Sequence, residues 1–284
     1  MFMEILKSIL YGIVQGITEW LPISSTGHLD LLNAVLPFNV YSTAAENVQF
    51  WNMYKVVIQF GSIIAVILLY FTKLNPWAST KSAEEKKGTW NLWIKILIAS
   101  IPAAIVGLLL DDIVDQYLST PYVIAIALIV YGVLFIWIEN RHKKAVIKSV
   151  EGISNKKAAE VGVFQMLALI PGTSRSGSTI LGATLLGFSR GTATEFSFFM
   201  AIPVMFGASL LKIVKMKMSI GFSGLIVLLV GMLVAFVVSV VVIRSFMKYI
   251  RKHDFKIFGL YRIVFGILIL VLAAAGILGT GFGA

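Results

Sequence analysis

Nine residues between two apolar runs, 171–179, combine groups that could bind an oxyanion. They read Pro-Gly-Thr-Ser-Arg-Ser-Gly-Ser-Thr and supply one cation and five hydroxyls. Gly172 permits a tight turn, hydroxyls donate hydrogen bonds, and the guanidinium of Arg175 can hold two oxygens. A following helix would direct its N-terminal N–H groups at the same ligand. The segment predicts an oxyanion site, and the alternative is a polar loop that lines a helix crossing.

A second polar segment brings a carboxylate close to hydroxyls. Glu19 follows Gln15 by four residues, which places both side chains on one face of a helix. The carboxylate could hold a divalent cation or act as a base beside a hydroxyl. Alternatively, Glu19 forms an ion pair with Arg175 that only ties the two segments together.

The residues that follow Glu19 are candidate nucleophiles and acids. Ser24, Ser25 and Thr26 could attack or donate, although at least one of them is expected to cap the following helix. His28 is the only histidine outside the basic connections of the chain. It is a candidate acid or base, and its alternative role is structural.

Together the two segments offer what phosphoryl transfer requires: charge to neutralise the oxygens, a nucleophile and an acid. The spacing Gly172-x4-Gly177 is similar to a Walker loop, but Ser178 stands where the lysine is needed and no strand precedes it. An ATPase is therefore excluded. The residues alone favour anion handling and leave hydrolysis and transport both open.

The composition places these residues in a membrane protein. Hydrophobic residues make up 58% of 284 positions, charged ones 13%, and mean hydropathy is +0.90. Several apolar runs reach about 20 residues, the length that crosses a bilayer. The net charge of +10 is assigned to cytoplasmic connections, because no basic face with interleaved aromatics indicates nucleic-acid binding. The absence of cysteine excludes disulfides and thiol chemistry. The N-terminus shows no cleavable signal, so none is expected.

Both polar segments lie between apolar arms too short to cross a bilayer. The first arms are 5–21 and 29–36, around the tip 22–28, and the second are 158–170 and 180–188. Such pairs predict re-entrant hairpins, which are tolerated where protein or water surrounds the tip. Residues 38–52 are predicted to be a connection. Six full spans are predicted at 56–72, 92–110, 122–138, 196–211, 221–243 and 257–278.

Loop charges assign the sides of the membrane. The connections after the first, third and fifth spans are rich in lysine and arginine and are predicted to be cytoplasmic. The acidic segment 111–115 is predicted to be an outer turn. Lys212, Lys215 and Lys217 fall on the outer side and conflict with this rule, but the other connections outweigh them.

The chain is predicted to be one membrane domain, 1–284, made of two repeats. The repeats, about 1–138 and 158–284, are joined by a basic cytoplasmic linker, 139–157. Each has a hairpin and three spans, an odd number of crossings, so the repeats should have opposite orientations. The first hairpin would enter from outside, the second from the cytoplasm, and their tips would meet near the midplane. The expected fold is all-α and polytopic with an inverted-topology repeat.

Two motifs resemble the signatures of the undecaprenyl-diphosphate phosphatases of the bacitracin-resistance type. The resemblance covers nearly the whole chain, including 57–62 and 195–198, and the family accepts Glu or Gln at the opening position held here by Gln15. The motifs are Gln15-x3-Glu19-Trp20-Leu21-Pro22-Ile23-Ser24-Ser25-Thr26-Gly27-His28 and Pro171-Gly172-Thr173-Ser174-Arg175-Ser176-x2-Thr179.

The resemblance implies an enzyme that hydrolyses undecaprenyl diphosphate to the monophosphate, recycles the lipid carrier for peptidoglycan synthesis and confers bacitracin resistance. It implies a multi-pass protein of the bacterial inner (plasma) membrane, a site facing the outer side, a divalent cation (Mg²⁺ or Ca²⁺) and a homodimer. The implied catalytic residues are Glu19, which would also hold the metal, Ser25, His28 and Arg175. The expected substrate-binding residues are Gln15, Ser24, Thr26, Gly172, Thr173, Ser174, Ser176 and Thr179.

Two questions stay open at this point. The nucleophile is expected to be either Ser25, with His28 or Glu19 accepting its proton, or a water molecule. The alternative function is a transporter or flippase for a polyprenyl phosphate or another anionic lipid, because inverted repeats with a midplane site are typical of transporters.

Overall fold

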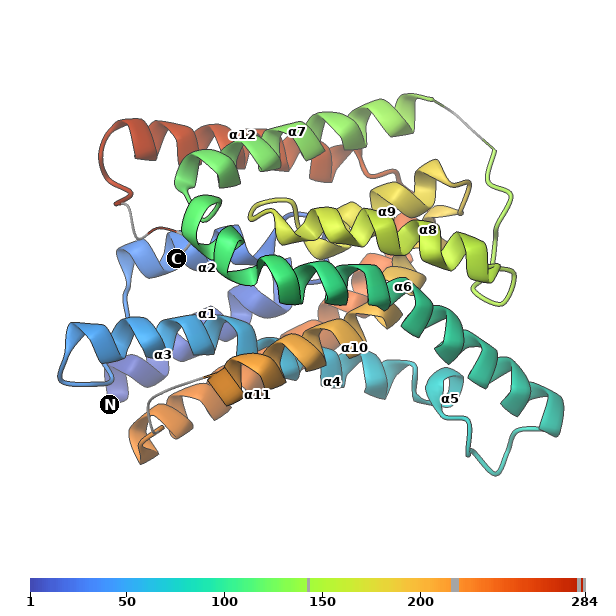
Figure 1. Ribbon diagram of the computed structural model, residues 1–284, viewed down its shortest axis with the longest axis horizontal. Helices are drawn as coiled ribbons and strands as arrows, with labels where there is room; N and C mark the ends of the chain where they lie inside the picture. The colour runs from blue at the N-terminus through green and yellow to red at the C-terminus, as the bar shows by residue number, and fades with distance from the viewer. Residues whose placement is uncertain (142–143, 216–219, 280–281, 283–284) are drawn as a thin grey trace.

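The computed structural model describes residues 1–141, 144–215, 220–279 and 282, and these are mostly helical (Figure 1). The elements in chain order are α1 (Phe2–Thr18), α2 (Ser25–Val35), α3 (Ala44–Val57), α4 (Gln59–Leu69), α5 (Phe71–Leu74), α6 (Ala83–Tyr117), α7 (Pro121–Asn140), α8 (Asn155–Met166), the short 3₁₀ helix η1 (Leu167–Leu169), α9 (Arg175–Leu185), α10 (Arg190–Lys215), α11 (Phe222–Ile250) and α12 (Lys256–Ala274).

Six helical stretches within the described residues are long and apolar enough to cross a membrane. Many of their aliphatic side chains are exposed on the outside of the bundle, including Leu233 and Val271, as expected where lipid surrounds the protein. The all-α polytopic membrane fold is confirmed. The stretches are Ala44–Leu69, Ala83–Leu110, Pro121–Asn140, Arg190–Lys215, Phe222–Ile250 and Lys256–Ala274.

The two short helical hairpins are also present. The first consists of α1 and α2, and the second of α8, η1 and α9. Each turn contains the proline, Pro22 or Pro171, that ends the preceding arm. The opposite orientation of the two repeats stays a prediction.

The connection predicted at 38–52 is wrong, because α3 begins at Ala44. Thr43 caps this helix in a capping box with Glu46. α3 joins α4 to give one 26-residue stretch. Its polar residues lower the hydropathy, but Phe50 and Tyr54 are fully buried against neighbouring helices. Burial of this face therefore holds the helix in place.

The outer turn predicted at 111–115 is also wrong, since α6 continues through it to Tyr117. The chain turns at 118–120, where Thr120 caps α7 and Pro121 occupies the first helical turn. Pro102 lies inside α6 and does not end it. Of the basic positions used for topology, 143 and 217 lie outside the described residues.

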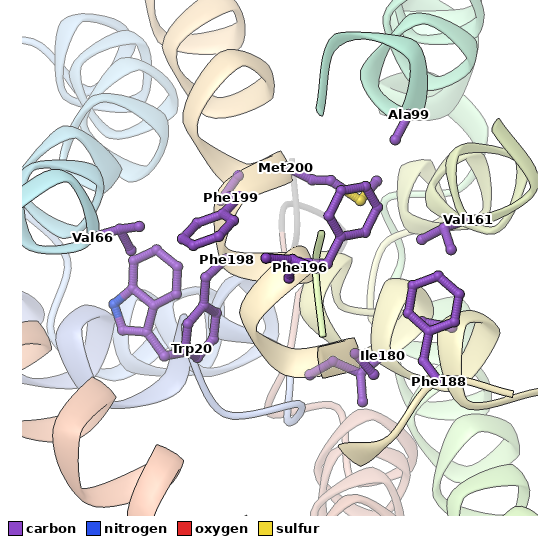
Figure 2. Packing of buried hydrophobic residues seen from close by; sticks show 14 of the residues in the cluster. Trp20, Val66, Ala99, Val161, Ile180, Phe188, Phe196, Phe198, Phe199 and Met200 are labelled. Atoms are coloured by element: carbon purple, nitrogen blue, oxygen red, sulfur yellow. The ribbon is translucent and has the colours of Figure 1, made fainter. Parts of the chain in front are cut away.

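A large aromatic core surrounds the first half of α10. Trp20, Phe196, Phe198 and Phe199 are fully buried there (Figure 2). The ring of Trp20 meets that of Phe198 edge to face, with centroids 4.9 Å apart. Because Trp20 follows Glu19 directly, this packing fixes the backbone that carries the carboxylate.

Candidate active site

The turns of the two hairpins are in contact, although about 150 residues separate them in the sequence. The hydroxyl of Ser176 donates to the carbonyls of Glu19 (3.2 Å) and Leu21 (3.3 Å). Ser24 and Ser174 occupy matching positions as the N-caps of α2 and α9, both with positive φ, at 74° and 71°. The predicted contact between the tips is confirmed, whereas their position near the membrane midplane stays a prediction. Ser24 has the predicted capping role.

Gly172 shapes the second turn in a way that another residue could not. Its φ is +90°, and a Cβ there would collide with the backbone of Ile124 in α7. The turn therefore packs directly on α7.

Arg262 of α12 holds both turns and was missed in the sequence, where it is the single cation of the apolar run 257–278. Its guanidinium is fully buried. It donates to the carbonyl of Pro22 (3.0 Å) in the first turn and to those of Gly172 and Thr173 (both 2.9 Å) in the second. The sequence did contain a signal for this role. A guanidinium at membrane depth is costly unless hydrogen-bond acceptors surround it, so an arginine within this apolar run indicates buried acceptors nearby.

Glu19 is the centre of the polar contacts. Its Oε2 accepts from the hydroxyl of Ser25 (2.8 Å) and from the amide of Gln15 (3.1 Å). Its Oε1 lies 3.3 Å from Nη2 of Arg175, so the ion pair that was considered as the alternative role of Glu19 is present. The same carboxylate therefore contacts a candidate nucleophile and a candidate oxyanion binder.

Arg175 is anchored but has donor capacity left. Its Nη1 donates to the carbonyl of Ser197 in α10 (2.9 Å), and its buried Nε has no partner among the described residues. Thr179, one turn further along α9, contacts the hydroxyl of Ser197 (2.7 Å) and the carbonyl of Arg175 (2.8 Å). Thr179 thus fixes the helix that carries Arg175.

A cavity of about 210 Å³, called here the central cavity, opens at this junction. Glu19 and Arg175 are the only charged side chains among its described lining residues. The predicted residues that line it are Glu19, Ser24, Ser25, Thr26, Gly172, Ser174 and Arg175. Gln15, Thr173, Ser176 and Thr179 are buried but do not line it.

His28 does not line the central cavity. Its Nδ1 donates to the carbonyl of Ser24 (2.7 Å), and its Nε2 lies 2.6 Å from the hydroxyl of Tyr261. The ring stacks on Phe265 with centroids 3.9 Å apart. In this structure His28 therefore joins the first hairpin to α12, and its catalytic role stays a prediction.

The donors near Glu19 fit a hard divalent cation in part. No group of three or more His, Cys, Asp or Glu side chains that could hold a metal occurs among the described residues. However, the amide oxygen of Gln15 is buried without a partner beside the Glu19 carboxylate. Mg²⁺ commonly binds one or two carboxylates and completes its shell with water and substrate phosphates.

The sequence is similar to a family of membrane proteins along almost its full length. A family model described as "Bacitracin resistance protein BacA" matches residues 8–268. Undecaprenyl-diphosphatase 1 of Clostridioides difficile (strain 630) is 53% identical over 270 residues, which cover 94% of this chain and 96% of the relative. An undecaprenyl-diphosphatase of Enterococcus faecalis is 52% identical over 277 residues, 96% of this chain and 98% of the relative. An undecaprenyl-diphosphatase of Streptococcus mutans is 50% identical over 275 residues, which cover 95% of this chain and 96% of the relative. With a matching family model and relatives covered at this length, the chain belongs to the bacitracin resistance protein BacA family.

Proposed function

We propose that this protein hydrolyses undecaprenyl diphosphate to undecaprenyl phosphate and phosphate, as the names of its relatives state for them. One observation carries the chemistry: the hydroxyl of Ser25 donates to Glu19, which also pairs with Arg175, beside one cavity. By this reaction the protein would recycle the lipid carrier for peptidoglycan synthesis and confer bacitracin resistance.

Substrate binding begins with an exchange of partners at Arg175. The diphosphate presents several charged oxygens, and it competes with Glu19 for the guanidinium. The unpartnered Nε of Arg175 supplies a further donor. Since α2 and α9 both begin at the central cavity, their first-turn N–H groups add partial positive charge at the same place.

Ser25 is the proposed nucleophile. Its Oγ attacks the terminal phosphorus while its proton passes to Oε2 of Glu19, and the bond from that phosphorus to the bridging oxygen breaks. Undecaprenyl phosphate leaves after its former bridging oxygen takes that proton from Glu19. Water then attacks the phosphoserine, the ionised Glu19 accepts a proton from this water, and the bond between phosphorus and the Ser25 Oγ breaks. The 2.8 Å contact favours Glu19 over His28 as the base, because His28 lies outside the lining.

Glu19 and the amide oxygen of Gln15 are the proposed ligands of a divalent cation, Mg²⁺ or Ca²⁺. A cation bound there would supply positive charge to the diphosphate oxygens. Arg175 would then bind the diphosphate oxygens whose charge the cation does not neutralise.

The proposed location is the inner (plasma) membrane, with the central cavity on the outer side. The cavity contacts the later half of α10, at Val204, Met205 and Ala208. That helix begins at Arg190, beside Arg141 and Lys144 of the basic connection, so its later half lies away from that connection. This arrangement supports an outer-facing site. The homodimer implied by the family resemblance stays a prediction, which the mass of the detergent-solubilised protein would test.

The test is phosphate release from a polyprenyl diphosphate by the purified protein, with and without divalent cations. We expect Arg175→Ala and Ser25→Ala to lose activity, whereas Ser42→Ala, an exposed serine outside the site, retains it. Acid-quenched Ser25 phosphopeptide would support covalent catalysis, and its absence would favour direct attack by water. If folded Arg175→Ala and His28→Ala both keep full activity, the site assignment is wrong. Counterflow in vesicles without phosphate release would instead indicate a transporter.

A further inference from the structure

A second cavity lies where α7 and α11 end and α10 begins, away from the central cavity. Its volume is about 460 Å³, and we call it the basic cavity. The charged residues in its described lining are four cations and one carboxylate, which leave three formal positive charges. They are Arg141, Lys144, Arg190, Arg251 and Glu139.

The single carboxylate is already satisfied. Glu139 is buried, accepts from Nε of Arg190 at 2.9 Å, and also accepts from the backbone N–H of Phe255 (3.1 Å). The nearby Asp254 does not line the cavity and lies 3.8 Å from Lys256. The positive charges of Arg141, Lys144 and Arg251 therefore have no counter-ion among the described lining residues.

The N-terminus of α10 adds donors to the same space. In its first turn the N–H groups of Thr192 and Ala193 donate to Ser189. Within the described residues, the N–H groups of Arg190 and Gly191 have no backbone acceptor. A Cβ added at Gly191 would meet nothing within 4 Å, so the backbone there faces open space. α10 has 26 residues, long enough for a full macrodipole that favours an anion at this end.

We propose that the basic cavity binds a phosphate monoester or free phosphate, as a second phosphate site of this protein. A dianionic phosphate matches the excess of positive charge, and its oxygens suit both guanidinium forks and helix N–H groups. The Arg190–Glu139 pair fixes one wall. Arg141, which lies over the ring of Trp137 at 4.7 Å, and Arg251 supply positive charge that no carboxylate of the described lining balances. The ligand comes either from solution or from a lipid headgroup such as that of phosphatidic acid.

The test measures binding of labelled inorganic phosphate to the full chain in phosphatidylcholine nanodiscs. All proteins carry Arg175→Ala, which removes the cation of the central cavity. The test variant is Arg141→Ala with Arg251→Ala. The matched control is Lys248→Ala with Lys252→Ala, which removes equal charge from exposed residues outside the lining.

We expect one saturable site, weakened about tenfold or more in the test variant and unchanged within about twofold in the control. Displacement by short-chain phosphatidic acid, but not by short-chain phosphatidylcholine, would assign the lipid source. Displacement by free phosphate alone would assign the soluble source, and either result supports the site. Equal weakening in both variants, or no saturable binding, overturns the proposal. Hydrolysis of the polyprenyl diphosphate is measured in a separate assay. Failure of the second phosphate site can therefore be distinguished from failure of the proposed hydrolysis.

Discussion

Replacing Arg262 with methionine is expected to loosen the contact between the two hairpin turns. The change removes three short hydrogen bonds to carbonyls, one in the first turn and two in the second. At about 2 kcal/mol for each bond from a charged donor, the gross loss is about 6 kcal/mol. Removing a guanidinium from membrane depth recovers about 3 kcal/mol. The net loss of stability is then about 3 kcal/mol.

The assay is unfolding of the purified protein by a denaturing detergent, combined with the rate of phosphate release. Activity should fall by about 100-fold in kcat, because Glu19 and Arg175 are carried by different turns and must stay aligned. Arg262→Lys keeps the charge but not the planar fork, so it should recover only part of both losses. Arg244→Met, the same replacement at an exposed residue of α11, is the control. If Arg262→Met unfolds and reacts like the wild type, Arg262 does not hold the turns.

Three further predictions concern catalysis, packing and topology. Glu19→Gln should lower the rate of phosphate release by about 100-fold or more, as expected when a base is lost, and a rate near wild type would exclude Glu19 as the base. Gly61→Ala should destabilise by about 1–3 kcal/mol in thermal or detergent unfolding, because its Cβ would collide with the backbone of Met232 in α11. Gly207→Ala, where a Cβ meets nothing within 4 Å, should be neutral or stabilising. Because the chain has no cysteine, an impermeant maleimide added to intact cells should label Ser42→Cys but not Ser79→Cys, and the reverse pattern would invert the topology.

The hairpins could be predicted from the sequence because their signals are local. Pro22 and Pro171 end the arms, and the polar residues around them cannot face lipid. The residues that line the central cavity come from these two segments and from apolar helices around them. The segments that line the central cavity were therefore predictable from the sequence, whereas the distances between their side chains were not.

The connection predicted at 38–52 and the turn predicted at 111–115 were wrong for the same reason. Both predictions used charge and hydropathy, which do not mark where a helix begins or ends. α3 was missed because its polar residues interrupt the apolar pattern, although Thr43 and Glu46 form a capping box. The segment 111–115 was assigned to a turn because it is acidic, yet it contains no glycine or proline. The break lies at Thr120 and Pro121, which are the residues that favour a helix start.

Contacts between distant segments could not be derived from spacing. The sequence suggested that Glu19 and Arg175 could pair, but it did not indicate that Arg262 holds both turns. It also placed His28 near Ser24 without indicating that Tyr261 and Phe265 of α12 hold its ring. Side chains of α12, a helix that packs on α7, decide both outcomes.

The charges that line the central cavity explain why Glu19 of the first hairpin and Arg175 of the second depend on each other. Within the described lining, Glu19 and Arg175 cancel, so each residue offsets the membrane-depth cost of the other. A diphosphate carries at least two negative charges, and it adds them to a site that is formally neutral. Where Arg175 exchanges Glu19 for the diphosphate, Glu19 becomes a free carboxylate beside the hydroxyl of Ser25. The same exchange would thus bind the substrate and activate the nucleophile. The negative charge that remains after this exchange is the physical reason to expect that hydrolysis requires a divalent cation.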